Sequence, residues 1–173
     1  MVPAPADGAE LPSGAPLPGR AETGADRLGG ELTGISAGVL AGGYMGEVGR
    51  TWPVSNAENA AGLYRRWESL WSRLIAACQP GAGAGDLLAA YQAAGEPAPP
   101  MPVARGLGMG FDPPVISSYL PQTAAGERLD AGMVLAVTGY VWEPGIGAVF
   151  GREAVLINAD GPEVLTSSPS WRA

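Results

Sequence analysis

The N-terminal part of the hydrophobic pattern predicts a pair of strands. Residues 32–40 and 43–52 are rich in apolar and small side chains, and Gly42 and Gly43 lie where the two runs meet. Glycines tolerate the positive φ angles of a tight turn, and strand-like runs on both sides of such a turn are typical of a hairpin. We therefore expect two strands joined by a glycine turn.

The middle of the chain has helical periodicity. Apolar side chains recur at steps of three and four residues, which predicts an amphipathic helix that begins near Ala57 and is capped by Ser55 or Asn56. Its apolar stripe comprises Leu63, Trp67, Leu70, Trp71, Leu74, Ile75 and Cys78. A second, shorter helix is predicted from Gly85 to Ala94, with Gly95 ending it.

The remaining hydrophobic runs predict more strands. Apolar residues dominate 132–141 and 146–150, and a turn at 158–161 separates the strand-like runs 153–158 and 163–166. The Asn-Ala-Asp-Gly sequence of that turn indicates a hairpin. Strands, two helices and further strands, in that order, favour an α+β domain.

Composition divides the chain into an arm and a domain. Residues 1–30 are dominated by Pro, Gly, Ala and acidic residues, so we expect a poorly ordered arm, with an irregular segment on the core surface as the alternative. Residues 31–173 are long enough for one folded domain, and 46% of the chain is hydrophobic.

Charge and cysteine content exclude several classes of protein. The net charge of −7 disfavours binding to nucleic acid or to an anionic membrane surface. No run of about 18 apolar residues is present, so a membrane span is not expected. The lone Cys78 is typical of a reducing compartment, and the N-terminal residues lack a signal-peptide pattern. We therefore expect a cytoplasmic protein.

The most informative feature of the composition is that the chain contains no histidine. Histidine is the usual proton shuttle near neutral pH and the commonest metal ligand. A Ser-His-Asp hydrolase is excluded, because Ser36 has no histidine partner anywhere.

Four segments nevertheless resemble, in order, the pita-bread metallopeptidases, a family that includes methionine aminopeptidase, Xaa-Pro dipeptidase and creatinase. Residues 43–51 are similar to the family's "GYxxDxxRT" strand, and 105–114 to its "HGxG…HEPP" loop. Residues 129–135 resemble its "LxPGMV" strand entry, and 155–166 its closing hairpin "VLVTEDGPEVLT". The resemblance spans 31–169 and implies a partial pita-bread fold: a curved antiparallel sheet with two helices on one face, shorter than the family's usual two halves.

The resemblance also implies a site. The family holds two metal ions with two Asp, one His and two Glu, and these positions fall on Ser36, Glu47, Arg105, Thr138 and Arg152. Only Glu47 keeps a carboxylate, and the family's additional catalytic histidine has no counterpart. An arginine cannot act as a metal ligand, because it has no lone pair to donate. Its charge also repels a cation: two unit charges about 4 Å apart interact by roughly 4 kcal/mol at an effective dielectric near 20. We therefore expect no metal cofactor; the alternative is a divalent ion such as Mn, Co or Zn.

The two arginines require a counterion if they are buried. We expect Glu47 to face Arg105 or Arg152, and we consider Asp112 and Glu153 as further polar residues of the former metal cavity. A shift of one residue would direct Glu153 inward in place of Arg152.

These observations favour a metallopeptidase-like domain that has lost most of its metal ligands and serves a non-catalytic binding or scaffold role. The alternative is a metal-dependent aminopeptidase or Xaa-Pro peptidase with an atypical site. Because part of the family's core is absent, exposed apolar sheet should mark an interface. We expect a protein partner or a homo-oligomer, and a small peptide-like molecule is the expected class of ligand.

Overall fold

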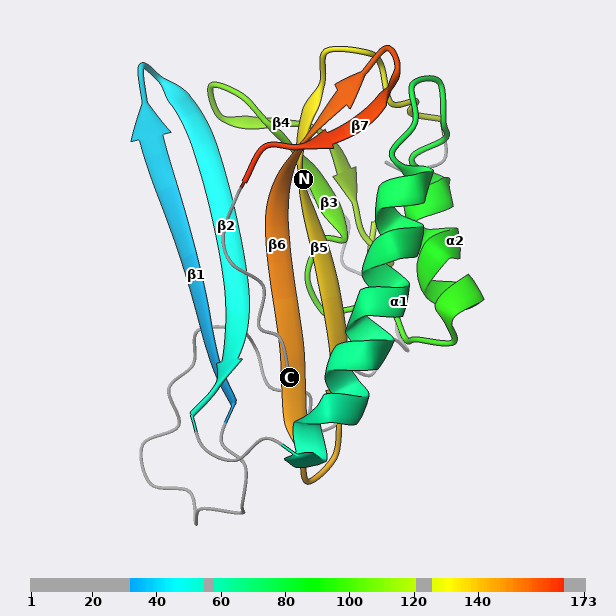
Figure 1. The fold of residues 1–173 in the computed structure, drawn as a ribbon. Coiled ribbons are helices and arrows are strands. Elements are labelled where there is room, and N and C mark those ends of the chain that lie inside the picture. Colours follow the sequence, from blue (N-terminus) through cyan, green and yellow to red (C-terminus); the bar gives the residue numbers. More distant parts are fainter. Residues whose placement is uncertain (1–31, 55–57, 121–125, 167–173) are drawn as a thin grey trace, which may run out of the picture.

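Seven strands of the described residues pair antiparallel in one sheet (Figure 1). The computed structural model describes residues 32–54, 58–120 and 126–166, so the prediction for residues 1–30 lies outside the described part. The strand order is β1-β2-β6-β5-β3-β4, and β7 pairs with β6. The strands are β1 (Leu32–Ala41), β2 (Tyr44–Pro53), β3 (Ala104–Leu107), β4 (Phe111–Ile116), β5 (Val134–Glu143), β6 (Gly147–Asn158) and β7 (Gly161–Val164).

The first predicted hairpin is confirmed. β1 and β2 pair without interruption from Leu32 opposite Pro53 to Ala41 opposite Tyr44. The connecting glycines have φ angles of 58° and 87°, a region in which a side chain would be strained. The glycine pair therefore fixes both the turn and the register of the hairpin.

The later strands differ from the prediction in three details, one of which is that the last strand, β7, runs over Gly161–Val164 and not over 163–166. Residues 146–150 and 153–158 were expected as separate runs, but β6 is one strand, because Gly151 and Arg152 stay in unbroken register with β5. β5 begins at Val134 and not at Gly132, whose φ of 94° belongs to a turn. The predicted turn at 158–161 is confirmed and joins β6 to β7.

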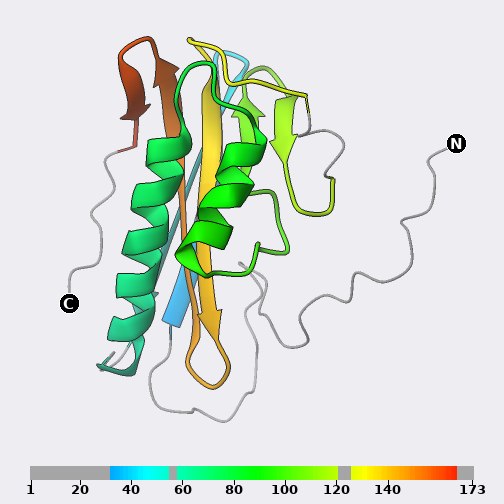
Figure 2. The same cartoon turned by 90° about the vertical axis from the view of Figure 1, so that its right-hand side faces the viewer.

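Two helices cover one face of the sheet, as predicted (Figure 2). Helix α2 runs from Gly85 to Ala94 and ends at Gly95, whose φ is 72°, in agreement with the sequence. The expected start of the first helix is wrong. Helix α1 (Ala61–Ala77) is preceded by a 3₁₀ turn, Glu58–Ala60, which takes up its first residues.

The predicted cap residues Ser55 and Asn56 lie outside the described residues. Ala60 occupies the N-cap of α1, and no side chain bonds to the free N–H groups there. None of the described helices is long and apolar enough to span a lipid bilayer.

Helix α1 approaches the sheet closely at one place. The predicted stripe is confirmed, with Leu63, Leu70, Leu74 and Cys78 fully buried. Trp67, on the same stripe, stacks on Trp71 with ring centroids 5.5 Å apart and donates its indole N–H to the Gly139 carbonyl at 3.1 Å.

Two glycines form the seat for the Trp67 indole. Gly139 and Gly151 are paired residues of β5 and β6. A Cβ on Gly151 would lie 2.3 Å from an indole carbon of Trp67, and one on Gly139 would lie 2.8 Å from its nitrogen. The helix can therefore pack at this distance only because both positions lack a side chain.

The sheet curls toward the face without helices. β2 and β3 are separated by β6 and β5, so a flat sheet would place them about 14 Å apart at ordinary strand spacing. The backbone N–H of Met45, in β2, nevertheless donates to the carbonyl of Gly108, just after β3, at 2.8 Å. This closure confirms a curved antiparallel sheet with two helices on one face.

The seat of Trp67 leads to a prediction about stability. We expect Gly151→Ala to destabilise the protein by about 1–3 kcal/mol, because the indole is held by stacking and a hydrogen bond and cannot move without loss. Urea unfolding followed by circular dichroism measures the change. Gly62→Ala in α1 is the matched control, since a Cβ there meets nothing within 4 Å. The Gly62→Ala control should raise the free energy of unfolding by about 0.5–1 kcal/mol. An unchanged free energy of unfolding in Gly151→Ala would contradict the prediction.

Candidate functional site

The candidate site lies on the helix-free, concave face of the sheet. Gly139 and Gly151 face α1, so their neighbours Thr138 and Arg152 face the opposite side, because adjacent residues of a strand alternate. Thr138 and Arg152 are themselves directly paired. Arg105 of β3 pairs with Ala136, two residues before Thr138, and therefore shares their face.

Glu47 of β2 lies between two arginines. One of its carboxylate oxygens accepts a hydrogen bond from Arg105, and the other accepts one from Arg152 at 3.3 Å. The side chains of Glu47, Arg105 and Arg152 are only 15%, 14% and 19% exposed, so the charges are largely removed from water. The predicted pairing of Glu47 with Arg105 or Arg152 is confirmed, and both arginines take part.

Thr138 completes the group. Its hydroxyl oxygen accepts a hydrogen bond from Nε of Arg152 at 3.0 Å, while the guanidinium carbon lies 5.4 Å from the ring centroid of Phe150. Burial lowers the pKa of Arg152, Glu47 raises it, and the charge of Arg105 lowers it again. The guanidinium is thus fixed on three sides. We call Glu47, Arg105, Thr138 and Arg152 the arginine cluster.

Glycines bring the strands of the cluster together. Gly49 is the residue of β2 that pairs with Arg152, and a Cβ there would lie 2.2 Å from the ring of Phe150. On the other side, the pairing of β3 with β4 is interrupted by a register shift between Arg105 and Gly106. A Cβ on Gly106 would lie 2.5 Å from two backbone oxygens of β4. The unpaired residues at this shift, Pro113 and Pro114, lie in β4, so β4 bends here while Arg105 stays in register with β5.

Three of the predicted site residues lie apart from this cluster. Ser36 is exposed on β1, opposite Gly49. Asp112 accepts a hydrogen bond from the backbone N–H of Gly110 at 3.2 Å and holds the loop between β3 and β4. Glu153 is buried, and as the next residue of β6 it points to the opposite side from Arg152.

Glu153 forms a second, separate ion pair. Its carboxylate contacts the guanidinium of Arg50 and the hydroxyl of Thr166, and Arg50 also donates to the Arg152 carbonyl at 3.2 Å. The alternative register, in which Glu153 would replace Arg152 in the concave face, is therefore not the one found. Burial lowers the pKa of Arg50.

Two supporting residues were not predicted as part of the site. Tyr91 of α2 donates its hydroxyl to the Thr138 carbonyl at 2.9 Å and accepts from the backbone N–H of Tyr140 at 3.0 Å. It therefore fixes β5 directly behind the cluster. A tyrosine within an apolar helix face is the signal that could have indicated this, because a buried phenol normally has a partner. The second residue is Gly49, whose lack of a side chain lets the Phe150 ring lie against β2. The sequence around Gly49 contains no comparable signal of this contact.

The chemistry of the cluster does not match that of a metal site. Within residues 32–54, 58–120 and 126–166, no three His, Cys, Asp or Glu side chains are grouped so that they could hold an ion. The single carboxylate of the cluster already contacts two guanidiniums, which are donors only. The side chains present here therefore do not fit a pair of dications.

Comparisons with solved structures agree with this architecture. The chain resembles a prolidase from Pyrococcus furiosus with a TM-score of 0.67 and 24% identity, over 80% of this chain and 42% of that one. It resembles a methionine aminopeptidase from Thermotoga maritima with a TM-score of 0.66 and 22% identity, over 79% and 64% of the two chains. The chain thus spans less than half of the prolidase, and these likenesses establish its fold.

A third similar structure is titled as the N-terminal domain of the FACT complex subunit SPT16 from Cicer arietinum. Its TM-score is 0.64 at 18% identity, over 80% of this chain and 36% of that one. A search of curated proteins found no match. The model of metallopeptidase family M24, however, matches residues 9–159, which is most of the 173 residues. The chain therefore belongs to metallopeptidase family M24, as the four resembling segments predicted.

Proposed function

We propose that this protein is a non-catalytic member of its family, with a binding or scaffold role. The observation that carries the proposal is the arginine cluster. At three of the five positions where the resemblance places metal ligands, the Glu47 carboxylate is ion-paired with both Arg105 and Arg152, so the three side chains carry a net charge of +1. The guanidiniums take up the carboxylate oxygens that an ion would need.

Electrostatics support this proposal independently of any particular ion. A dication near Arg105 and Arg152 would meet two like charges in a partly buried setting, each contributing roughly 4 kcal/mol per unit charge at about 4 Å. Arginine stays protonated at all ordinary pH values, so no change of pH relieves the repulsion. The remaining cluster residue, Thr138, offers a hydroxyl that is already bonded to Arg152.

The proposed role includes a protein partner or a homo-oligomer, or a small peptide-like ligand. Exposed apolar side chains gather on the first hairpin, where Ile35, Val39, Leu40 and Tyr44 are 56–72% exposed. Ile35 and Val39 lie on one face of β1 and Leu40 on the other, so both faces of the hairpin expose apolar side chains, as interaction surfaces do. The similar structure whose title names a subunit of a complex is consistent with such a role.

Metal content is the first test. We expect purified, dialysed protein to hold fewer than about one transition-metal ion per chain, because arginines occupy the ligand positions. Elemental analysis by mass spectrometry measures it. The comparison variant combines Ser36→Asp, Arg105→His, Thr138→Glu and Arg152→Glu, which restores the family's ligand types around Glu47, and should retain more metal. Stoichiometric Mn, Co or Zn in the natural chain, lost in Glu47→Ala, would contradict the proposal.

Hydrolysis is the second test. We expect no cleavage of peptides with N-terminal Met or Xaa-Pro above background in the presence of added Mn²⁺ or Co²⁺. No histidine is present to move a proton to or from the reacting groups. Liquid chromatography of the peptide products provides the measurement. Turnover that requires the metal and disappears in Glu47→Ala would establish the alternative, an active metallopeptidase with an atypical site.

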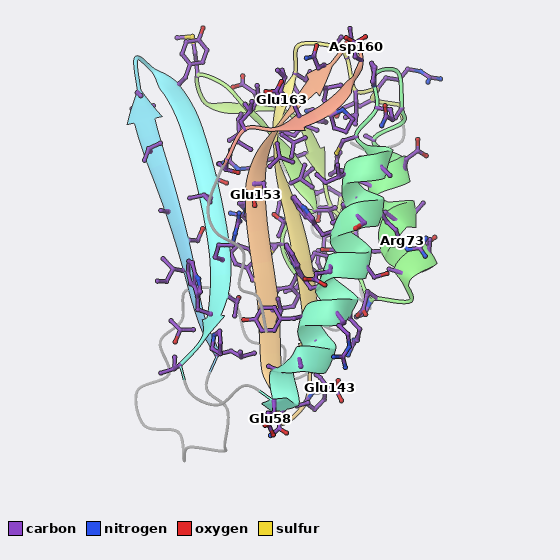
Figure 3. The ribbon with its side chains drawn as sticks, viewed as in Figure 1. Glu58, Arg73, Glu143, Glu153, Asp160 and Glu163 are labelled. Carbon is purple, nitrogen blue, oxygen red and sulfur yellow. The ribbon has the colours of Figure 1, made fainter. Side chains whose placement is uncertain are left out.

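The cluster also predicts a loss of stability. Glu47→Gln should destabilise folding by about 1–3 kcal/mol, because it leaves two largely buried guanidiniums without their carboxylate; complete burial would make the cost about 3–5 kcal/mol. Chemical unfolding measures this change. Glu163→Gln on β7 is the control, since Glu163 is exposed and its replacement should stay within about 0.5 kcal/mol (Figure 3). Equal effects of the two variants would show that the ion pairs do not stabilise the fold.

A further inference from the structure

Strand β1 is an edge strand that is open to solvent on both faces. Every residue from 33 to 41 is exposed, and only Leu32 is partly covered. Among the described strands, β1 has β2 as its single neighbour (Figure 1). The outer edge of β1 therefore presents a row of backbone N–H and C=O groups over ten residues.

This edge lacks the features by which soluble proteins usually prevent strand pairing. Typical devices are charged side chains, proline, a β-bulge or a very short strand. The ten residues of β1 include no ionisable side chain and no proline. Their register with β2 is continuous, without a bulge. Nothing in the strand itself opposes the addition of another strand.

The absence of charge on β1 is compatible with a second copy of this chain as the added partner. The chain as a whole carries a net charge of −7, so two copies repel each other over most orientations. β1 is uncharged, so pairing of the two β1 strands places no like charges opposite each other. Pairing along β1 therefore adds no contact between like charges to this overall repulsion.

The sequence of β1 is also complementary to itself in one antiparallel register. With Ala37 on the two-fold axis, residue numbers of directly opposite positions add up to 74. Ile35 then lies opposite Val39 of the partner subunit, and these β-branched side chains share one face. On the other face, Leu40 lies opposite Gly34 of the partner subunit, so a large side chain meets an open position.

We propose that two copies of this protein associate by antiparallel pairing of their β1 strands around Ala37, which joins the two sheets into one. This inference rests on the proposed scaffold role, and it identifies the outer edge of β1 as the interaction surface and a second copy of the chain as the partner. Leu32 would lie opposite Gly42 of the partner subunit.

Association is tested by sedimentation velocity of the full chain over a dilution series. We expect a species of about 35 kDa, twice the 17.5 kDa of one chain, which dissociates on dilution. Val39→Lys places a charge on the edge and should give a 17.5 kDa species throughout the same range. Val164→Lys, at another exposed valine on β7, is the control and should behave like the natural chain. A natural chain of 17.5 kDa at every concentration, or a dimeric Val39→Lys, would overturn the proposal.

The register is tested by oxidation of single-cysteine substitutions. Ala37→Cys should form an intermolecular disulfide, because directly opposite residues have Cα atoms about 4.5–5.5 Å apart, within the range of a disulfide. Thr33→Cys is the control, since the two substituted positions would lie eight residues apart along the strands, about 27 Å. The native Cys78 is buried, and burial raises the pKa of its thiol to about 12, so it should not react.

The two tests separate this inference from the proposed function. Cross-linking of Ala37→Cys alone supports the register, whereas cross-linking of Thr33→Cys, or of neither variant, overturns it. Metal content and hydrolysis do not depend on β1. A monomeric protein without metal would refute the pairing and leave the non-catalytic role in place. A dimeric protein with stoichiometric metal would support the pairing and refute the non-catalytic role.

Discussion

One carboxylate, that of Glu47, connects three strands of the sheet, β2, β6 and β3. β2 is paired with the neighbouring strand β6 at a single position, Gly49 opposite Arg152. Glu47 adds contacts from β2 to β6 through Arg152 and to β3 through Arg105, and β3 lies beyond β5 in the strand order. Such contacts are feasible only on a curved sheet, so the ion pairs and the curvature depend on each other.

The cluster also shows how basic side chains can balance a largely buried carboxylate on a concave polar face. A buried carboxylate must be neutralised, either by a metal or by a basic side chain. Guanidiniums provide charge and directed hydrogen bonds from the same atoms, and they need no ligand set around them. The consequence is chemical: a metal ion can exchange its ligands and activate water, whereas Arg105 and Arg152 can only donate hydrogen bonds.

Local signals in the sequence predicted the local structure well. Gly95 ends α2 in a left-handed conformation, and the turn at 158–161 joins β6 to β7, because each depends on residues close in the chain. The start of α1 and the continuity of β6 were missed, since both depend on tertiary packing. The family resemblance predicted that Glu47, Arg105 and Arg152 lie together. The curvature of the sheet and the lack of a side chain at Gly49 make their ion pairs feasible, and neither can be recognised from the neighbouring sequence.

The two parts of the sheet are consequently held by different forces. β5 and β6 pack beneath α1 through a dense apolar core, with Trp67 seated on paired glycines. The β1–β2 hairpin lies beside this core and makes several polar contacts with β6 and α1 (Figure 1). The Thr51 hydroxyl bonds to the Phe150 backbone at 2.8 and 3.1 Å, and the Tyr64 hydroxyl donates to the Thr51 carbonyl at 3.0 Å. Segments with few apolar contacts open at lower free energy than the core. Glu47, Arg50 and Thr51 therefore together hold the hairpin, and with it β1 as an edge for another strand.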